Sequence, residues 1–117
     1  MVNRSQYNPR YREVRELVAQ RVRESLKMQG TTQTDFAIDH YTDLGLGKRS
    51  SAIGYVSHFA QGRSTDGAPG ERPFSPLELS RMSTILRLLN LGEDSELIEK
   101  IEQVAPNFRD YNKPIQK

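Results

Sequence analysis

Two short stretches decide the fold of this chain: residues 30–37 read GTTQTDFA, and residues 50–63 read SSAIGYVSHFAQGR. In the first stretch Thr32 precedes Asp35 by three positions, as in a capping box, where each side chain meets an unpaired backbone amide. Gly30, just upstream, is typical of the left-handed residue that ends a helix. The stretch therefore predicts the end of one helix and the start of the next.

The second stretch predicts a helix with two faces. Val56 and Phe59 lie one turn apart and are expected to face an interior. Ser50 or Ser51 is expected to cap this helix, and Gly62 to stop it. The side chains expected to face solvent are Tyr55, Ser57 and His58.

Apolar residues at steps of three and four mark further helices over about residues 10–28, 75–91 and 94–105. Ser75 followed by Pro76 and Glu78 is the strongest helix start in the chain, and Gly92 is expected to close that helix. We predict an all-α fold of about five helices. Its parts are a flexible basic arm (1–9), a single helical domain (10–105) with a long loop (62–75), and a C-terminal tail (106–117).

Composition limits the class of protein. The 117 residues have a mean hydropathy of -0.72, no cysteine and no long apolar run, which predicts a cytoplasmic protein without disulfides or membrane spans. Residues 1–63 carry 10 Lys/Arg against 6 Asp/Glu, a net +4, whereas residues 64–117 carry 7 against 9, a net -2. The basic first half favours a polyanionic partner.

The order of these segments resembles the helix-turn-helix of the phage-repressor (Cro/Xre) family over about residues 14–91. The family pattern is a Thr/Ser-Gln pair, an apolar-Ala pair one turn later, and a recognition helix ending near a glycine and a basic residue. One departure is clear: where the family has a glycine after the second helix, this chain has Tyr41, and its next glycines are Gly45 and Gly47. The turn is therefore longer than in the family. The matching residues are Thr32, Gln33, Phe36, Ala37, Val56, Phe59, Gln61, Gly62 and Arg63.

The resemblance implies a sequence-specific, double-stranded-DNA-binding transcription regulator whose recognition helix, residues 51–61, enters the major groove. The residues expected to contact base edges are Ser51, Gly54, Tyr55 and His58. Those expected to contact the DNA backbone are Thr32, Gln33, Lys48, Arg49, Ser50 and Arg63. Arg4, Arg10 and Arg12 are candidates for a minor-groove arm.

Such readers commonly act as homodimers on paired half-sites, and the last helix offers one candidate contact, or else completes the monomer core. The apolar face of that helix consists of Leu97, Ile98, Ile101 and Val104.

Two other functions remain open. One is a protein-interaction module on the helix-turn-helix scaffold, for instance an antitoxin or an adaptor to another regulator, because the turn is long and the expected base-contact positions hold no Arg, Gln or Asn reader. RNA binding is the weaker alternative, since aromatic residues make up only 8% of the chain. An enzyme, a metal site and a cofactor are not expected: His40 and His58 are the only histidines, and residues 45–50 lack the spacing of a phosphate-binding loop.

Overall fold

The computed structural model describes residues 7–63 and 70–112, and every regular element in these two ranges is an α-helix. The all-α prediction is confirmed, with one helix more than expected. None of the helices within these ranges is long and apolar enough to cross a membrane. The helices are α1 (Pro9–Met28), α2 (Gln33–His40), α3 (Arg49–Ala60), α4 (Pro76–Leu88), α5 (Ser95–Val104) and α6 (Phe108–Tyr111).

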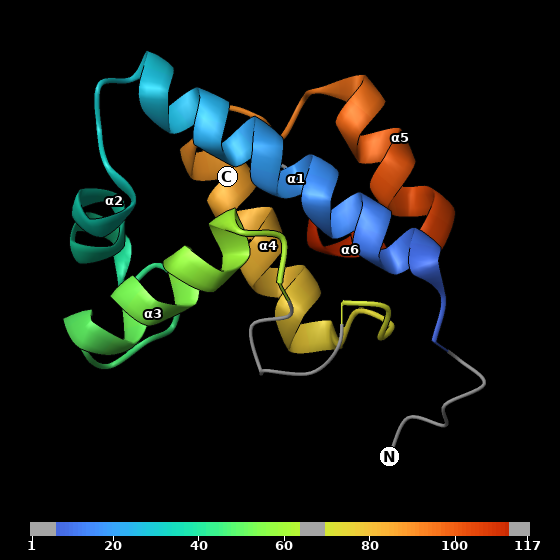
Figure 1. Cartoon of the computed structure of the whole chain (residues 1–117), viewed down its shortest axis with the longest axis horizontal. Helices are drawn as coiled ribbons and strands as arrows, with labels where there is room; N and C mark the ends of the chain where they lie inside the picture. The colour runs from blue at the N-terminus through green and yellow to red at the C-terminus, as the bar shows by residue number, and fades with distance from the viewer. Residues whose placement is uncertain (1–6, 64–69, 113–117) are drawn as a thin grey trace.

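The long helix α1 runs across the molecule, and the other helices are arranged around it (Figure 1). At one end α2 packs against α3, and α3 also packs against α1. At the other end α5 lies along α1, and the short α6 contacts both α4 and α5. The arrangement leaves α2 and α3 together at one end of the molecule, well away from α5.

Side-chain caps explain where four of these helices begin. Asn8, Thr32, Ser75 and Asp94 each accept a hydrogen bond from a backbone amide in the first turn, at 2.9–3.1 Å. Each cap satisfies a donor that the helix itself leaves unpaired, which contributes about 1 kcal/mol. The predicted starts at Thr32, Ser75 and Asp94 are confirmed.

The predicted cap of α3 is wrong. The helix begins at Arg49 with Lys48 in the N-cap position, and no side chain caps it. Ser50 and Ser51 lie instead inside the first turn, exposed to solvent. A hydroxyl near a helix start favours capping only at the one position with extended backbone, and here Lys48 holds that position.

Helices α1 and α3 each end just before a glycine with left-handed backbone. Gly30 and Gly62 have φ angles of +69° and +74°, as predicted for residues that stop α1 and α3. The predicted closure of α4 by Gly92 is wrong, because the helix ends at Leu88 and Asn90 takes the left-handed conformation with φ +61°. Asparagine is one of the few other residues that adopts it readily.

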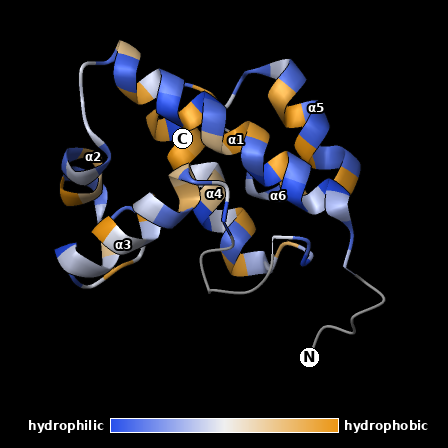
Figure 2. Cartoon of the chain, in the orientation of Figure 1, coloured by the Kyte–Doolittle hydropathy of each residue, from blue (hydrophilic) through white to orange (hydrophobic). Residues whose placement is uncertain are grey.

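The core is a continuous apolar cluster to which every helix contributes, visible as the apolar stripes of α1, α4 and α5 in Figure 2. Full burial of one large aliphatic or aromatic side chain contributes about 1.5–3 kcal/mol. The largest fully buried apolar side chains are Phe108, Leu79, Met82, Ile85, Leu86, Leu97, Ile101, Val18, Val22 and Val56.

The predicted C-terminal tail is part of the domain. Phe108 in α6 is completely buried, and the Ser83 hydroxyl of α4 donates to the Tyr111 carbonyl at 2.7 Å. A four-residue helix with one apolar anchor has no periodicity, so the sequence gives no signal of this packing. Residues 113–117 lie outside the described part of the chain.

The buried Arg15 holds residues 70–72 of the long loop against the domain through hydrogen bonds. The Arg15 guanidinium donates to both carboxylate oxygens of Glu78 at 2.9 and 2.8 Å, and to the carbonyls of Gly70 and Arg72 at 2.5 and 2.6 Å. It also lies 4.2 Å from the centre of the Phe74 ring. These contacts join the loop to α1 and α4. Of the predicted loop, residues 64–69 lie outside the described ranges.

The predicted basic arm ends earlier than expected. The Asn8 amide donates to the Glu71 carbonyl at 2.8 Å, so the chain is already part of the domain before α1 begins. Arg12 forms an ion pair with Glu71. Residues 1–6, including Arg4, lie outside the described ranges.

Candidate nucleic-acid interface

The turn between α2 and α3 is an ordered connection built around Leu44. This side chain is 2% exposed, and its carbonyl accepts a hydrogen bond from Arg81 Nε of α4 at 3.0 Å. Gly45 follows with φ +73°, which reverses the chain toward α3. The extra residues that distinguish this turn from the family pattern therefore serve as an apolar anchor between the two helices.

Helix α3 has one buried and one exposed face. The buried positions follow the steps of three and four expected of a helix packed on a core: Ala52, Tyr55, Val56, Phe59 and Ala60. The exposed positions are Arg49, in the first turn, and Ser50, Ser51, Gly54 and His58 on the side away from the core.

The prediction that Tyr55 faces outward is wrong. Its side chain is 9% exposed, its ring stacks on Phe59 with centroids 6.4 Å apart, and the Arg81 guanidinium lies 5.1 Å from its ring centre. Tyr55 is four residues before Phe59 and three after Ala52, which places it on the buried stripe. The Tyr55 ring therefore packs between α3 and the core, and it is not available to contact a ligand.

The other three predicted base-contact residues are exposed on one side of α3. Ser51, Gly54 and His58 follow one another at steps of three and four, so they share a face. A side-chain carbon built on Gly54 would meet no atom within 4 Å, so this glycine is open to solvent. The structure thus brings these three residues together as expected.

Two further polar side chains continue this face and were not predicted as site residues. Gln61 Nε2 donates to the Ser57 hydroxyl at 3.1 Å, on the exposed side of the C-terminal half of α3. Their spacing from Gly54, three and seven residues, is the signal that would have identified them. We define the exposed face of α3 as Ser51, Gly54, the half-buried Ser57, His58 and the C-cap residue Gln61.

Cations flank the exposed face at both ends. Lys48 and Arg49 precede it and Arg63 follows it, all three exposed, and residues 44–63 contain no Asp or Glu. The Arg49 guanidinium lies 5.6 Å from the centre of the Tyr41 ring in the preceding turn. Such a cation–π contact directs the arginine stem while its donors stay available.

The N-terminus of α2 supplies the remaining predicted backbone contacts. Thr32 is exposed, and its hydroxyl oxygen already accepts from the Asp35 amide at 3.0 Å, which leaves its O–H to donate. Gln33 is half-buried in the first turn of the helix. Asp35 is exposed in the first turn of the same helix, so an anion that reaches Thr32 and Gln33 also meets the negative charge of Asp35.

Five of the arginines in the first half of the chain contact other residues of the protein. Arg15 is buried against Glu78, Arg21 pairs with Asp94 at 2.8 Å, and Arg23 donates to the Ala60 carbonyl at 2.6 Å. Arg10 and Arg12, proposed from the sequence for a minor-groove arm, contact Gln103 and Glu71. Lys48, Arg49 and Arg63 flank α3 and are exposed, and Arg23, also exposed, is held at the C-terminal end of α3 by its bond to Ala60.

Comparison with protein-family models, with curated proteins and with solved structures found no match for this chain. Within residues 7–63 and 70–112, no three histidine, aspartate or glutamate side chains gather as metal ligands would. The interpretation of the site therefore depends on the geometry and charge of α2 and α3.

Proposed function

We propose that this protein is a sequence-specific, double-stranded-DNA-binding transcription regulator that inserts α3 into the major groove. The single observation that carries the proposal is the exposed face of α3, which has only small or polar side chains, contains no acid, and has cations before and after it. Such a face fits the groove floor between two negatively charged phosphate backbones.

The dimensions agree with this docking. Helix α3 has 12 residues and is thus about 18 Å long, and an α-helix with its side chains, about 10–12 Å across, fits a major groove about 12 Å wide. Ser51, Gly54 and His58 contact base edges in this arrangement. The DNA backbone is contacted by Thr32, Gln33, Lys48, Arg49, Ser50 and Arg63.

The chemistry of the face sets how sequence is read. His58 donates to a purine acceptor, Ser51 pairs with either class of base edge, and Gly54 permits a close approach. Ser57 and Gln61 extend the readable face, and a glutamine amide matches the donor–acceptor pattern of adenine. With few bidentate contacts, part of the specificity comes from DNA shape and ordered water.

The regulator acts in the cytoplasm as a homodimer on paired half-sites, because a single recognition helix buries too little surface for tight specific binding. The apolar face of α5, the dimer contact considered from the sequence, is not available as a whole. Leu97 and Ile101 are completely buried, and Ile98 and Val104 are half-buried.

A second candidate is a protein-interaction module, such as an antitoxin or an adaptor to another regulator. Two observations favour it: α3 exposes no Asn reader, and α2 exposes Ile38 at 37% beside Asp35 and Asp39. A mixed apolar and acidic patch suits a protein surface better than a phosphate backbone.

Fluorescence anisotropy with a labelled random-sequence duplex separates the two candidates. The regulator binds at low salt and loses affinity steeply as salt rises, with a log–log slope of about 0.9 for each phosphate neutralised. Arg49→Ala and Arg63→Ala each lower that slope, whereas Lys100→Ala, an exposed charge loss on α5, leaves it unchanged. No binding at low salt rejects the DNA proposal in favour of the interaction module.

A further inference from the structure

A second surface lies where the C-terminal end of α1 meets the connection between α4 and α5. Two hollows of about 350 and 380 Å³ adjoin there and share Asn90 as a wall. We define the Asn90 face as Met28, Arg87, Asn90, Leu91 and Glu93. None of the residues that line either hollow belongs to α2 or α3, so this face is separate from the proposed DNA-binding surface.

One half of the Asn90 face is apolar. Met28 is 88% exposed, the most exposed of the large apolar side chains within the described ranges. The hollow beside it has Leu89 and Leu91 in its wall, together with the polar residues Arg21, Glu24, Ser25, Gln29 and Asn90. An exposed thioether next to an apolar hollow is costly in water, and methionine is enriched in protein–protein interfaces. This half therefore offers both a projecting apolar side chain and a recess that accepts one.

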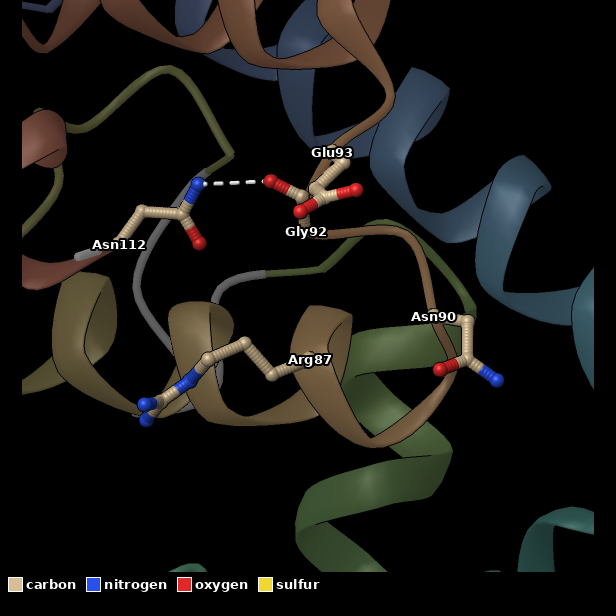
Figure 3. Close-up of a pocket in the computed structure, with 5 residues that line it drawn as sticks. All are labelled: Arg87, Asn90, Gly92, Glu93 and Asn112. Atoms are coloured by element: carbon tan, nitrogen blue, oxygen red, sulfur yellow. Dashed lines mark hydrogen bonds between the residues drawn. The ribbon is translucent and has the colours of Figure 1, made fainter. Parts of the chain in front are cut away.

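The other half carries one exposed charge of each sign, Arg87 and Glu93. Within residues 7–63 and 70–112 neither side chain has a hydrogen-bond or ion-pair partner. Figure 3 shows that Arg87 and Asn90 extend in different directions and do not converge on one point, whereas Asn112 bonds the Gly92 carbonyl at 3.0 Å across the hollow. Divergent side chains fit a broad partner surface better than a single small ligand.

The backbone of this face is fixed before any partner arrives. The Leu91 amide donates to the Leu86 carbonyl at 2.7 Å, the Asn90 amide to the Arg87 carbonyl at 3.1 Å, and the Ser25 hydroxyl to the Leu89 carbonyl at 3.1 Å. A preformed surface loses little conformational entropy on association.

We propose that the Asn90 face is the homodimer contact, with a second copy of this chain as its occupant. In a two-fold interface each patch meets its own copy, so Arg87 of each protomer pairs with Glu93 of the other. Met28 of each protomer enters the apolar hollow of its partner. A single patch that carries both signs is complementary to itself about a two-fold axis.

This inference rests on the homodimer of the proposed function but not on DNA binding, and it is tested without DNA. Sedimentation equilibrium gives the dimer dissociation constant of the wild type and of Met28→Glu, Arg87→Glu and Glu93→Arg. Because the symmetry doubles every change, each charge reversal weakens the dimer by about tenfold or more. The three side chains are exposed, so circular dichroism is expected to show an unchanged fold.

Two rescue measurements make the test specific. The double variant Arg87→Glu/Glu93→Arg restores opposite charges in both pairs and regains a dissociation constant near that of the wild type. Mixing the Arg87→Glu protein with the Glu93→Arg protein gives a heterodimer tighter than either homodimer, because both of its pairs are then opposite in charge.

A wild type that stays monomeric at several hundred micromolar overturns the inference, as does a dimer that is insensitive to all three single substitutions. A charge-sensitive dimer that fails to bind duplex DNA upholds the contact and rejects the proposed function, so the two failures are distinct.

Discussion

At Gly54, a larger side chain is expected to stabilise α3 but to weaken the proposed DNA binding. Gly54 lies in the middle of α3 on the exposed face, and a side-chain carbon there would meet no atom within 4 Å. A glycine inside a helix destabilises the protein by about 0.5–1 kcal/mol relative to alanine. No contact inside the described protein requires glycine here, and the proposed close approach of DNA supplies a physical reason for it.

The substitution Gly54→Ala therefore separates stability from binding. We expect the free energy of unfolding to rise by about 0.5–1 kcal/mol, which raises the melting temperature by a few degrees, about 2–6 °C for a domain of this size. In the proposed docking the added methyl group occupies space that the DNA would fill, so duplex affinity is expected to fall by about tenfold, equivalent to about 1.4 kcal/mol.

Calorimetric melting and fluorescence anisotropy measure the two effects on the same samples. Gln103→Ala, an exposed and uncharged change on α5, serves as the control and is expected to leave DNA affinity unchanged. A more stable Gly54→Ala protein with full DNA affinity would refute the assignment of this face to the groove. A less stable one would show that the space beside Gly54 is not open.

Three further predictions test the fold and the site. Glu78→Ala leaves the Arg15 guanidinium buried without its carboxylate and is expected to lower the free energy of unfolding by about 3–5 kcal/mol in urea titrations; a loss below 1 kcal/mol would contradict the burial of this pair. Phe108→Ala empties a fully buried site in α6 and is expected to cost about 3–5 kcal/mol by thermal unfolding, whereas a mere tail would show no change. His58→Ala is expected to reduce discrimination between DNA sequences selected from a random pool while keeping nonspecific affinity, and Arg63→Ala to weaken all sequences alike; equal effects from the two would reject their separate roles.

The helices could be predicted from the sequence because their signals are local. Thr32, Ser75 and Asp94 each cap the helix that follows, and the apolar steps of α1, α4 and α5 match the buried stripes. Capping and periodicity depend on residues within one or two turns, so a single sequence is enough to identify them. The exposure of Ser51, Gly54 and His58 follows from the same local pattern.

Two errors, the cap of α3 and the end of α4, are choices between neighbouring residues, whereas the others concern contacts between residues distant in the sequence. Tyr55 has a polar hydroxyl and stands beside Val56. Its ring lies on the buried stripe of Ala52 and Phe59 and also contacts Arg81 of α4, 26 positions later. The arginines of α1 contribute to a basic excess in the sequence, yet Arg15 and Arg21 are neutralised by acids from α4 and from the start of α5. Such pairings are set by tertiary packing, and composition alone does not reveal them.

The central claim is that the exposed face of α3 contacts duplex DNA, and an amide nuclear-magnetic-resonance titration of the labelled protein with a short duplex at low salt tests it most directly. The account predicts that the amide signals of Ser51, Gly54 and His58 shift in proportion to bound DNA, together with that of Gln33, while those of α5 stay in place. Signals of α3 that remain unmoved at saturating duplex, or shifts confined to other helices, would contradict it.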